Sequence, residues 1–378
     1  MITRFYHQKL EQMLAPGKVL VIYGPRRVGK TTLVKNFLKS YSGKIYQSTG
    51  ENIKLREILE SSDFSKIIPF FKDYDLAFID EAQWVSNIGL GLKIVVDQIP
   101  HLRVIATGSS SFDLSNKLGE PLVGRQSIIK LYPISIQELK DNFGGGYIAE
   151  NLNNLMIYGS YPDVLLAQSF KKKREYLEQI RDSYLFKDIL ELENIGNSKK
   201  VHDLLRLVAY QIGQEVSHHE LGTKLGMSKN TVARYLDLLE KAFVLINVGG
   251  FSRNQRKEVS KTSRYYFYDN GVRNAIIGNF NSLDSRQDTG QLWENLMFIE
   301  RMKFRQMQGI DASYYFWRTY DQKEIDLIEE RDGKLFGYEM KWGRSKSDRS
   351  KKEWLKVYQN AEFRVVDKEN YLDFVGGE

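Results

Sequence analysis

Residues 18–32 read KVLVIYGPRRVGKTT: a β-rich run, a glycine-containing loop and the start of a helical stretch. Within this stretch, Gly24–Thr31 fits the spacing G-x-x-x-x-G-K-[ST]. The glycines allow backbone N–H groups to close around phosphate groups, and the following helix adds the positive end of its dipole. The stretch therefore predicts a phosphate-binding loop between a strand and a helix.

The loop residues have distinct expected tasks. Lys30 would reach the β- and γ-phosphates of a nucleotide, and Thr31 would bind Mg²⁺. Arg26 and Arg27 would contact either the nucleotide or a partner. The predicted nucleotide-binding residues are Gly24, Pro25, Arg26, Arg27, Val28, Gly29, Lys30, Thr31 and Thr32.

The second half of such a site is predicted on two later strands. Asp75–Asp80 reads DLAFID and is followed by Glu81. Asp80 would hold Mg²⁺ through water, and Glu81 would polarise the attacking water. The next strand ends in TGSSS at Thr107–Ser111. There Ser109, or Thr107 in its place, would sense the γ-phosphate or orient the water; the alternative for these hydroxyl residues is simple turn formation.

Alternation of short strands and helices extends over the first ~140 residues and predicts a parallel sheet flanked by helices. The expected strands are Lys18–Tyr23, Lys44–Ser48, Asp75–Asp80, Arg103–Ser109 and Ser127–Leu131, with helices at Lys30–Ser40, Ile53–Leu59 and Ile88–Ile99. Residues 148–245 have a helical pattern. Aromatic strands are then expected at Tyr265–Asp269, Tyr314–Arg318, Glu324–Glu329 and Leu335–Lys341. We expect three domains, at residues 1–150, 151–250 and 251–378.

Further motifs carry a resemblance to a known family. They are Asp80-Glu81-Ala82-Gln83, and Gly124-Arg125 followed by Leu131-Tyr132-Pro133-Ile134-Ser135. Together with the phosphate loop, this set resembles the AAA+-type P-loop ATPases of bacteria and archaea, and within them a family whose ATPase domain precedes an uncharacterised C-terminal domain. The resemblance implies ATP as the nucleotide, because the phosphate loop itself reads only phosphates. It also implies that Arg125 stabilises charge at the γ-phosphate, in its own subunit or on a neighbour.

The helical block contains two helices separated by a short turn. Ser228 would cap the second helix, in which Val232, Leu236 and Leu239 share one face. This pattern resembles a winged helix-turn-helix that inserts its second helix into DNA; the alternative is a lid or packing domain. The expected DNA-contacting residues are Lys229, Asn230, Thr231 and Arg234, together with Arg253, Arg256 and Lys257 of the basic segment Phe251–Arg264.

In the C-terminal block, Glu294, Asp326, Glu339 and Lys341 suit Mg²⁺-dependent phosphodiester cleavage. Alternation along the strand places Glu339 and Lys341 on one face, and a turn at Asp332-Gly333 would bring Asp326 beside them. Asp326 and Glu339 would hold a second Mg²⁺, and Lys341 would stabilise charge. The pattern resembles the restriction-endonuclease-like D…E-x-K motif; the alternative is a salt-bridged strand in an inactive fold.

Composition limits the remaining possibilities. The chain has 378 residues, 42% of them hydrophobic and 27% charged, which excludes wholesale disorder. It has no cysteine, which excludes disulfides, thiolate catalysis and cysteine-based metal sites. The net charge of +7 is spread along the chain and is weak evidence for an anionic partner. Without an apolar membrane span or signal-peptide core, we expect a cytoplasmic protein.

The expected fold class is therefore α/β: a P-loop NTPase with an AAA+-like parallel sheet, then a winged helix-turn-helix and a restriction-endonuclease-like α/β domain. The leading functional hypothesis is an enzyme, a Mg²⁺-dependent ATPase that acts as a switch or motor, with DNA, a protein partner or a second copy of itself as partner. One alternative is an ATP-controlled regulatory binding module with an inactive nuclease-like fold. Another is an ATP-gated, Mg²⁺-dependent DNA nuclease.

Overall fold

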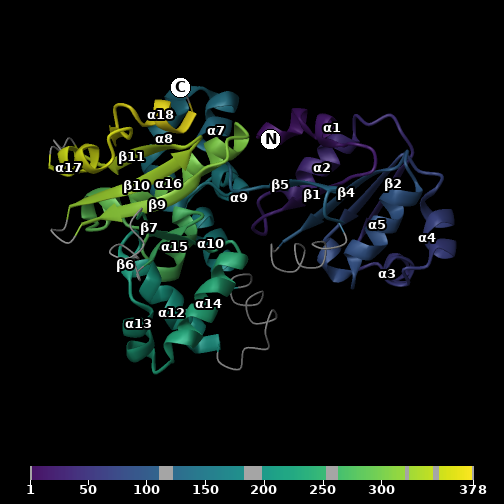
Figure 1. Cartoon of the computed structure of the whole chain (residues 1–378), viewed down its shortest axis with the longest axis horizontal. Coiled ribbons are helices and arrows are strands. Elements are labelled where there is room, and N and C mark those ends of the chain that lie inside the picture. The colour runs from purple at the N-terminus through teal and green to yellow at the C-terminus, as the bar shows by residue number, and fades with distance from the viewer. Residues whose placement is uncertain are drawn as a thin grey trace. The chain divides into compact units, whose positions relative to one another are not determined.

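The computed structural model describes residues 2–109, 122–182, 198–252, 263–319, 323–343 and 349–376. The chain forms two compact units, the first made of Met1–Pro133 with Lys241–Phe243 and the second of Ile134–Glu240 with Val244–Glu378. Each unit has its own sheet (Figure 1).

The first unit is a parallel sheet with helices. Its elements are η1 (Phe5–Gln8), α1 (Leu10–Met13), β1 (Val19–Tyr23), α2 (Lys30–Leu38), β2 (Ile45–Thr49), α3 (Ile53–Glu60), α4 (Phe64–Phe71), β3 (Leu76–Asp80), η2 (Ala82–Trp84), α5 (Ile88–Gln98), β4 (Arg103–Gly108) and β5 (Gln126–Lys130). The strand order is β2-β3-β4-β1-β5, and every pairing is parallel. All five residues of β1 are buried, as expected for a strand with neighbours on both sides.

This topology brings the predicted motifs to one edge of the sheet. β4 lies between β1, which precedes the phosphate loop, and β3, which ends in the acidic pair. In a parallel sheet all carboxyl ends meet at the same edge, where ligands bind. The strands expected from the sequence are confirmed to within a residue or two. The helices expected from the sequence do not include α4, which contains Pro69 although an interior proline normally disrupts a helix.

The second unit combines helices with a seven-stranded mixed sheet. Its elements are α7 (Ile136–Phe143), α8 (Gly145–Tyr158), α9 (Pro162–Leu166), α10 (Phe170–Ile180), α12 (Ser198–Tyr210), β6 (Glu215–Val216), α13 (His218–Leu225), α14 (Lys229–Lys241), β7 (Leu245–Gly250), β8 (Ser263–Phe267), α15 (Asn270–Ile277), η5 (Leu283–Ser285), α16 (Thr289–Met307), β9 (Ser313–Arg318), β10 (Glu324–Arg331), β11 (Lys334–Met340), α17 (Arg349–Val357), β12 (Glu362–Val366) and α18 (Tyr371–Gly376).

The order of this sheet is β12-β11-β10-β9-β7-β8-β6. The parallel pairing of β7 with β9 joins residues on both sides of the boundary that the sequence suggested near residue 250. The expected turn between β10 and β11 is present, with Asp332 and Gly333 at φ 50° and 72°. Positive φ at both central residues is the geometry of the tight hairpin turn that matches strand twist.

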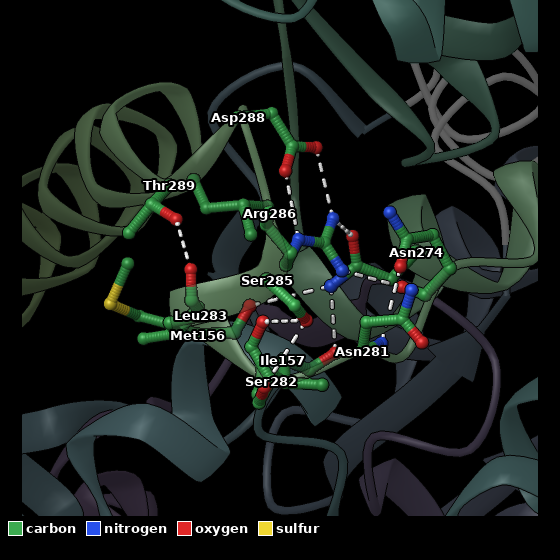
Figure 2. Close-up of polar contacts among 12 residues, drawn as sticks. Met156, Ile157, Asn274, Asn281, Ser282, Leu283, Ser285, Arg286, Asp288 and Thr289 are labelled. Carbon is green, nitrogen blue, oxygen red and sulfur yellow. Dashed lines mark hydrogen bonds and ion pairs between the residues drawn. The ribbon is translucent and has the colours of Figure 1, made fainter.

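The long helix α16 packs against β8 and β11 and is fixed at its first turn by an ion network (Figure 2). Asp288, the residue before the helix, accepts hydrogen bonds from the guanidinium groups of Arg286 (Nε to Oδ1, 2.8 Å) and Arg273. Burial alone would raise the pKa of Asp288, but the hydrogen bonds and charges of Arg286 and Arg273 outweigh it and lower the pKa to about 2. Arg286 also donates to Asn274 on α15, at 2.9 Å, which ties the two helices together.

Candidate functional site

The phosphate loop begins directly after β1 and ends at α2. Gly24 has φ 153°, and a Cβ at this position would lie 2.0 Å from the carbonyl oxygen of Leu131, so only glycine fits here. Gly29, at φ 94°, is the N-cap residue directly before α2. The N–H groups of the first turn of α2 have no partner within the helix, and together with the helix dipole they favour an anion.

Lys30 is buried in the loop, with 6% of its surface exposed. Its ammonium group donates to the carbonyl oxygens of Gly24 (2.9 Å) and Pro25 (2.8 Å). The charge therefore lies against the loop, where an anionic phosphate would meet it. Among the other predicted loop residues, Val28 is buried, Arg26 half-buried, and Arg27 and Thr32 exposed.

Asp80, at the end of β3, joins the phosphate loop to β4. Its carboxylate accepts hydrogen bonds from Thr31 Oγ1, at 3.0 Å to each oxygen, and from Thr107 Oγ1. A hydroxyl and a carboxylate in contact fit Mg²⁺, which takes one or two protein oxygens and completes its shell with water and phosphate. The structure therefore brings Thr31 and Asp80 into contact, and their role as Mg²⁺ ligands stays a prediction.

Glu81 follows in the left-handed region, at φ 49°, and is fixed at two points. Its N–H donates to Thr107 Oγ1 at 3.2 Å, and its side chain accepts a hydrogen bond from Gln83 Nε2. Gln83 Nε2 also donates to Ser109 Oγ at 3.1 Å. Thr107 is fully buried, and its hydroxyl already donates to Asp80 and accepts the N–H of Glu81. Ser109 is therefore the better placed of the two hydroxyl residues for sensing a phosphate.

Two residues at this site escaped sequence reasoning. Gln83 was part of the quoted motif but had no assigned role, although its position two residues after Glu81 was a usable signal. For Arg4, no motif or pattern in the sequence indicated a role. Its guanidinium donates to the carbonyl oxygens of Val28 in the phosphate loop and of Tyr132 after β5, both at 2.7 Å, and so braces the loop from outside.

Arg125 does not lie with these residues. Its carbonyl oxygen accepts the N–H of Val19, the first residue of β1, whereas the phosphate loop follows Tyr23, the last. Five strand residues span about 13 Å. Within one chain Arg125 is therefore at the opposite edge of the sheet from the phosphate loop, where its Nε pairs with Asp97 Oδ1 at 2.6 Å. The topology does not support a role for Arg125 at the γ-phosphate of its own chain.

Comparison with known proteins agrees with this geometry. Residues 16–140 match the model of a family described as an AAA domain. The chain carries an AAA domain. Residues 149–283 and 289–374 match two further family models, each described as a domain of unknown function (DUF8612 and DUF4143). The expectation of an AAA domain followed by an uncharacterised C-terminal domain is thereby confirmed.

Relatives that align with most of the chain occur in bacteria and archaea. An uncharacterized protein of Haemophilus influenzae is 26% identical over 348 residues, covering 86% of this chain and 83% of that protein. Others are found in Mycobacterium tuberculosis (25% identical, 88% of this chain, 72% of that protein) and Methanocaldococcus jannaschii (24%, 95% and 82%). A solved structure of Thermotoga maritima RuvB, described as a Holliday junction branch migration motor, has a TM-score of 0.28 at 17% identity, covering 68% of this chain and 88% of that one. At such a TM-score no conclusion follows from the likeness.

A second group of polar residues lies outside the AAA domain, on α16 and the strands β8, β10 and β11. Asp326 sits at a bulge in β10, and its Oδ2 accepts the N–H of Met340 at 2.7 Å. Bulges redirect side chains and often occur beside functional sites. Lys341 Nζ pairs with Glu339 Oε1 at 3.0 Å, while Glu339 Oε2 is buried without a hydrogen-bond partner.

Glu294 reaches the same region from α16. Its Oε1 accepts a hydrogen bond from Tyr266 Oη at 2.6 Å and lies 3.9 Å from Arg264 Nη1. Burial, and next the charge of Asp326, raise the pKa of Glu294 to about 8. Burial also raises the pKa of Asp326 to about 6, although the Met340 N–H and the charge of Lys341 act in the opposite direction. The four residues predicted for this site therefore lie close enough to influence one another.

The helices α13 and α14 place the residues expected to contact DNA. Ser228 caps α14 as predicted, because its Oγ accepts the N–H of Thr231 at 3.1 Å. The expected apolar face is buried, and Lys229, Asn230 and Arg234 are exposed, with Thr231 half-buried. The remaining three expected residues, Arg253, Arg256 and Lys257, lie outside the described residues.

The described part of the chain lacks two features. It has no helix long and apolar enough to cross a membrane. Nor does it contain three or more histidine, aspartate or glutamate side chains arranged to hold a metal ion.

Proposed function

We propose that the chain is a Mg²⁺-dependent ATPase whose AAA domain works as a switch or motor. The observation that carries this proposal is the continuous contact from Thr31 through Asp80 and Thr107 to Glu81, which aligns the phosphate loop with an acidic pair. When bound, Mg²⁺ would supply charge neutralisation at the β- and γ-phosphates.

In this proposal each protein group has one task. Lys30 and the N–H groups of α2 bind the phosphates, while Thr31 and Asp80 hold the ion. Glu81 accepts a hydrogen bond from the attacking water and orients it in line with the γ-phosphate. Ser109, at the end of β4, donates its hydroxyl hydrogen to the γ-phosphate.

The test is ATP turnover by the full chain and by the variants Lys30→Ala and Glu81→Gln. Lys30→Ala should abolish both nucleotide binding and turnover. Glu81→Gln keeps the size of the side chain and should lower kcat at least tenfold while nucleotide binding persists. Lys18→Ala, which changes a lysine outside the phosphate loop, serves as the control. Unchanged hydrolysis in both site variants would place the chemistry elsewhere.

A charge-stabilising role for Arg125 fits only the site of a neighbouring copy, because of its place in the sheet. We therefore propose that Arg125 acts at the γ-phosphate bound by a neighbouring copy of the chain. Its test mixes Arg125→Ala chains with Lys30→Ala chains, neither of which should hydrolyse ATP alone. Recovery of turnover in the mixture would support action between copies, since each chain would supply what the other lacks. No recovery would remove Arg125 from the mechanism.

A second candidate function is Mg²⁺-dependent phosphodiester cleavage in a restriction-endonuclease-like C-terminal domain. The observation in its favour is the buried oxygen of Glu339 that has no hydrogen-bond partner, next to Lys341 and Asp326. A buried carboxylate oxygen without a partner is costly, and a cation would satisfy it. Asp326 and Glu339 would hold the ion, which would supply charge neutralisation at a scissile phosphate. Lys341 would stabilise the charge of the phosphate from the other side.

Cleavage of a labelled DNA duplex in the presence of Mn²⁺ tests this function. Asp326→Asn and Lys341→Ala should each abolish cleavage. The control is Lys334→Ala, which changes an exposed lysine at the start of β11 and should leave cleavage unchanged. Equal cleavage by all variants would show another source of activity. Absence of cleavage by the wild-type chain would favour the alternative of a regulatory binding module with an inactive nuclease-like fold.

We further propose that residues from α12 to β8 form a winged helix-turn-helix that contacts DNA. The order α12-β6-α13-α14-β7-β8 and the three exposed residues at the start and outer face of α14 support this assignment. Each phosphate contact that is lost reduces the dependence of log affinity on log salt by about one. Lys229→Ala with Arg234→Ala should therefore flatten this slope, and the exposed Lys172→Ala should leave it unchanged. An unaltered slope in the double variant would exclude α14 from the interface.

A further inference from the structure

The side chain of Gln83 links two residues to which the proposed function assigns separate tasks. Gln83 lies in η2, directly after β3, and only 8% of its surface is exposed. One nitrogen atom, Nε2, donates both to Glu81 Oε2 and to Ser109 Oγ, the latter at 3.1 Å. Both hydrogens of the amide are thus directed at the site.

The direction of these hydrogen bonds follows from chemistry. An ionised carboxylate can only accept, so the amide must turn its NH₂ group toward Glu81. The second hydrogen then points at Ser109, whose oxygen accepts it. The hydroxyl hydrogen of Ser109 is consequently left to donate to another group, and an anionic phosphate is the strongest acceptor that this site is built to receive.

The same contact also restricts Glu81. With Oε2 engaged by Gln83, the carboxylate cannot rotate freely, and Oε1 remains to accept a hydrogen bond from water. The backbone N–H of Glu81 is held separately by Thr107. Two-point fixation of this kind keeps a reacting group in its productive geometry, and a displacement of about 1 Å can cost ~100-fold in rate.

A merely structural role explains these contacts less well. The turn of η2 has its own backbone hydrogen bonds, from Trp84 N–H to Glu81 O (3.2 Å) and from Val85 N–H to Ala82 O (3.1 Å). Neither involves the side chain of Gln83. If Gln83 served only to stabilise the turn, its amide would be expected to bond to these backbone groups and not to Glu81 and Ser109.

We propose that Gln83 is a positioning residue for ATP hydrolysis, which orients the Glu81 carboxylate and sets Ser109 as a hydrogen-bond donor to the γ-phosphate. This inference rests on the proposed ATPase function. In this proposal Gln83 acts on the reaction through Glu81 and Ser109.

The experiment measures kcat, KM for ATP, and affinity for a non-hydrolysable ATP analogue in the full chain. Gln83→Ala removes the donor. Gln83→Glu keeps the shape but places a second carboxylate against Glu81, and it remains informative if the alanine variant folds poorly. Gln98→Ala, an exposed glutamine at the end of α5, is the matched control.

Both Gln83 variants should lower kcat by about 10- to 100-fold. KM and analogue affinity should stay within about twofold of wild type, because the phosphate loop is untouched. In a Glu81→Gln background, Gln83→Ala should change kcat less than twofold, since the group that it positions has already lost its charge. Gln83→Ala and Ser109→Ala should likewise be non-additive, as residues acting as one unit are.

Three outcomes would overturn the inference. Turnover by both Gln83 variants at the wild-type rate would show that Glu81 needs no positioning. A parallel loss of analogue affinity and melting temperature in both would show a structural role. If the effects of Gln83→Ala and Glu81→Gln on kcat were fully additive, Gln83 would act through a group other than Glu81. These results differ from failure of the proposed function itself, in which the wild-type chain would show no Lys30-dependent turnover; in that case the inference would fall with it.

Discussion

Replacement of Thr107 by valine should test whether the hydrogen bonds between β3 and β4 hold the acidic pair in place. Thr107 is fully buried, and its Oγ1 donates to Asp80 and accepts the N–H of Glu81. Valine has nearly the same shape as threonine, but its side chain neither donates nor accepts a hydrogen bond. The loss of a hydrogen bond to a charged group costs about 1.5–3 kcal/mol, and a buried N–H without an acceptor costs about 1–3 kcal/mol. We therefore expect Thr107→Val to destabilise the AAA domain by about 3–5 kcal/mol.

The control is Thr107→Ser, which keeps the hydroxyl and loses one methyl group, at a cost of about 1 kcal/mol. Amide hydrogen exchange of peptides covering β3 and β4 measures local stability without requiring the whole chain to unfold in one step. Thr107→Val should raise the exchange rates of both strands far more than Thr107→Ser, and should also lower kcat at least tenfold. Equal exchange in the two variants would mean that water replaces the hydroxyl, and would refute the reasoning.

Three further outcomes are expected. Arg4→Ala should weaken binding of a fluorescent ATP analogue about tenfold, and Arg4→Lys should not restore it, because one ammonium cannot make the two-armed contact to the loop; an unchanged Kd would contradict the bracing role. Gly159 has φ 70°, and a Cβ added there would lie 2.0 Å from Asp269 Oδ1, so Gly159→Ala should lower the free energy of unfolding in urea by more than about 3 kcal/mol. Gly278 has a similar φ of 68° but open space around it, and Gly278→Ala should cost only about 1–2 kcal/mol. Burial raises the pKa of the Asp269 carboxyl from 3.8 to about 6. The stability that this shift contributes is therefore fully present below pH 4 and is lost as pH rises through 6. Asp269→Asn should destabilise the protein more at pH 4.5 than at pH 7, and equal losses of stability at the two pH values would disprove the raised pKa.

The AAA domain could be predicted from sequence because its signals are local. The phosphate loop is one continuous stretch, and the alternation of strands and helices around it fixes which ends of the strands meet. Arg125 shows the limit of this reasoning. Its motif indicated a role at the γ-phosphate, but its position relative to the phosphate loop depends on the register of β5 against β1, which no local pattern specifies.

The contacts of Arg4 and the pairing of β7 with β9 were beyond sequence reasoning for a related reason. Arg4 contacts Tyr132 across 128 residues of sequence, and β7 ends more than sixty residues before β9 begins. Long-range partners are chosen by the packing of the whole unit, and composition or periodicity carries no record of that choice. In contrast, the Asp332-Gly333 turn and the Ser228 cap were predictable, because their partners lie within a few residues.

The buried polar residues around Glu294 are difficult to explain by folding alone. A buried ionisable group usually stabilises a fold less than an apolar side chain of similar size would. Here Asp326 on β10, Glu339 on β11 and Glu294 on α16 come from three different elements, and one oxygen of Glu339 is buried without a hydrogen-bond partner. The ion network at Asp288 fixes the first turn of α16, the helix that carries Glu294, so the placement of this carboxylate is itself supported by other buried charges. A chain selected only for stability would lose little by replacing these residues, and for that reason a bound cation is the first explanation to test, by the melting temperature of wild type and Asp326→Asn with and without Mn²⁺.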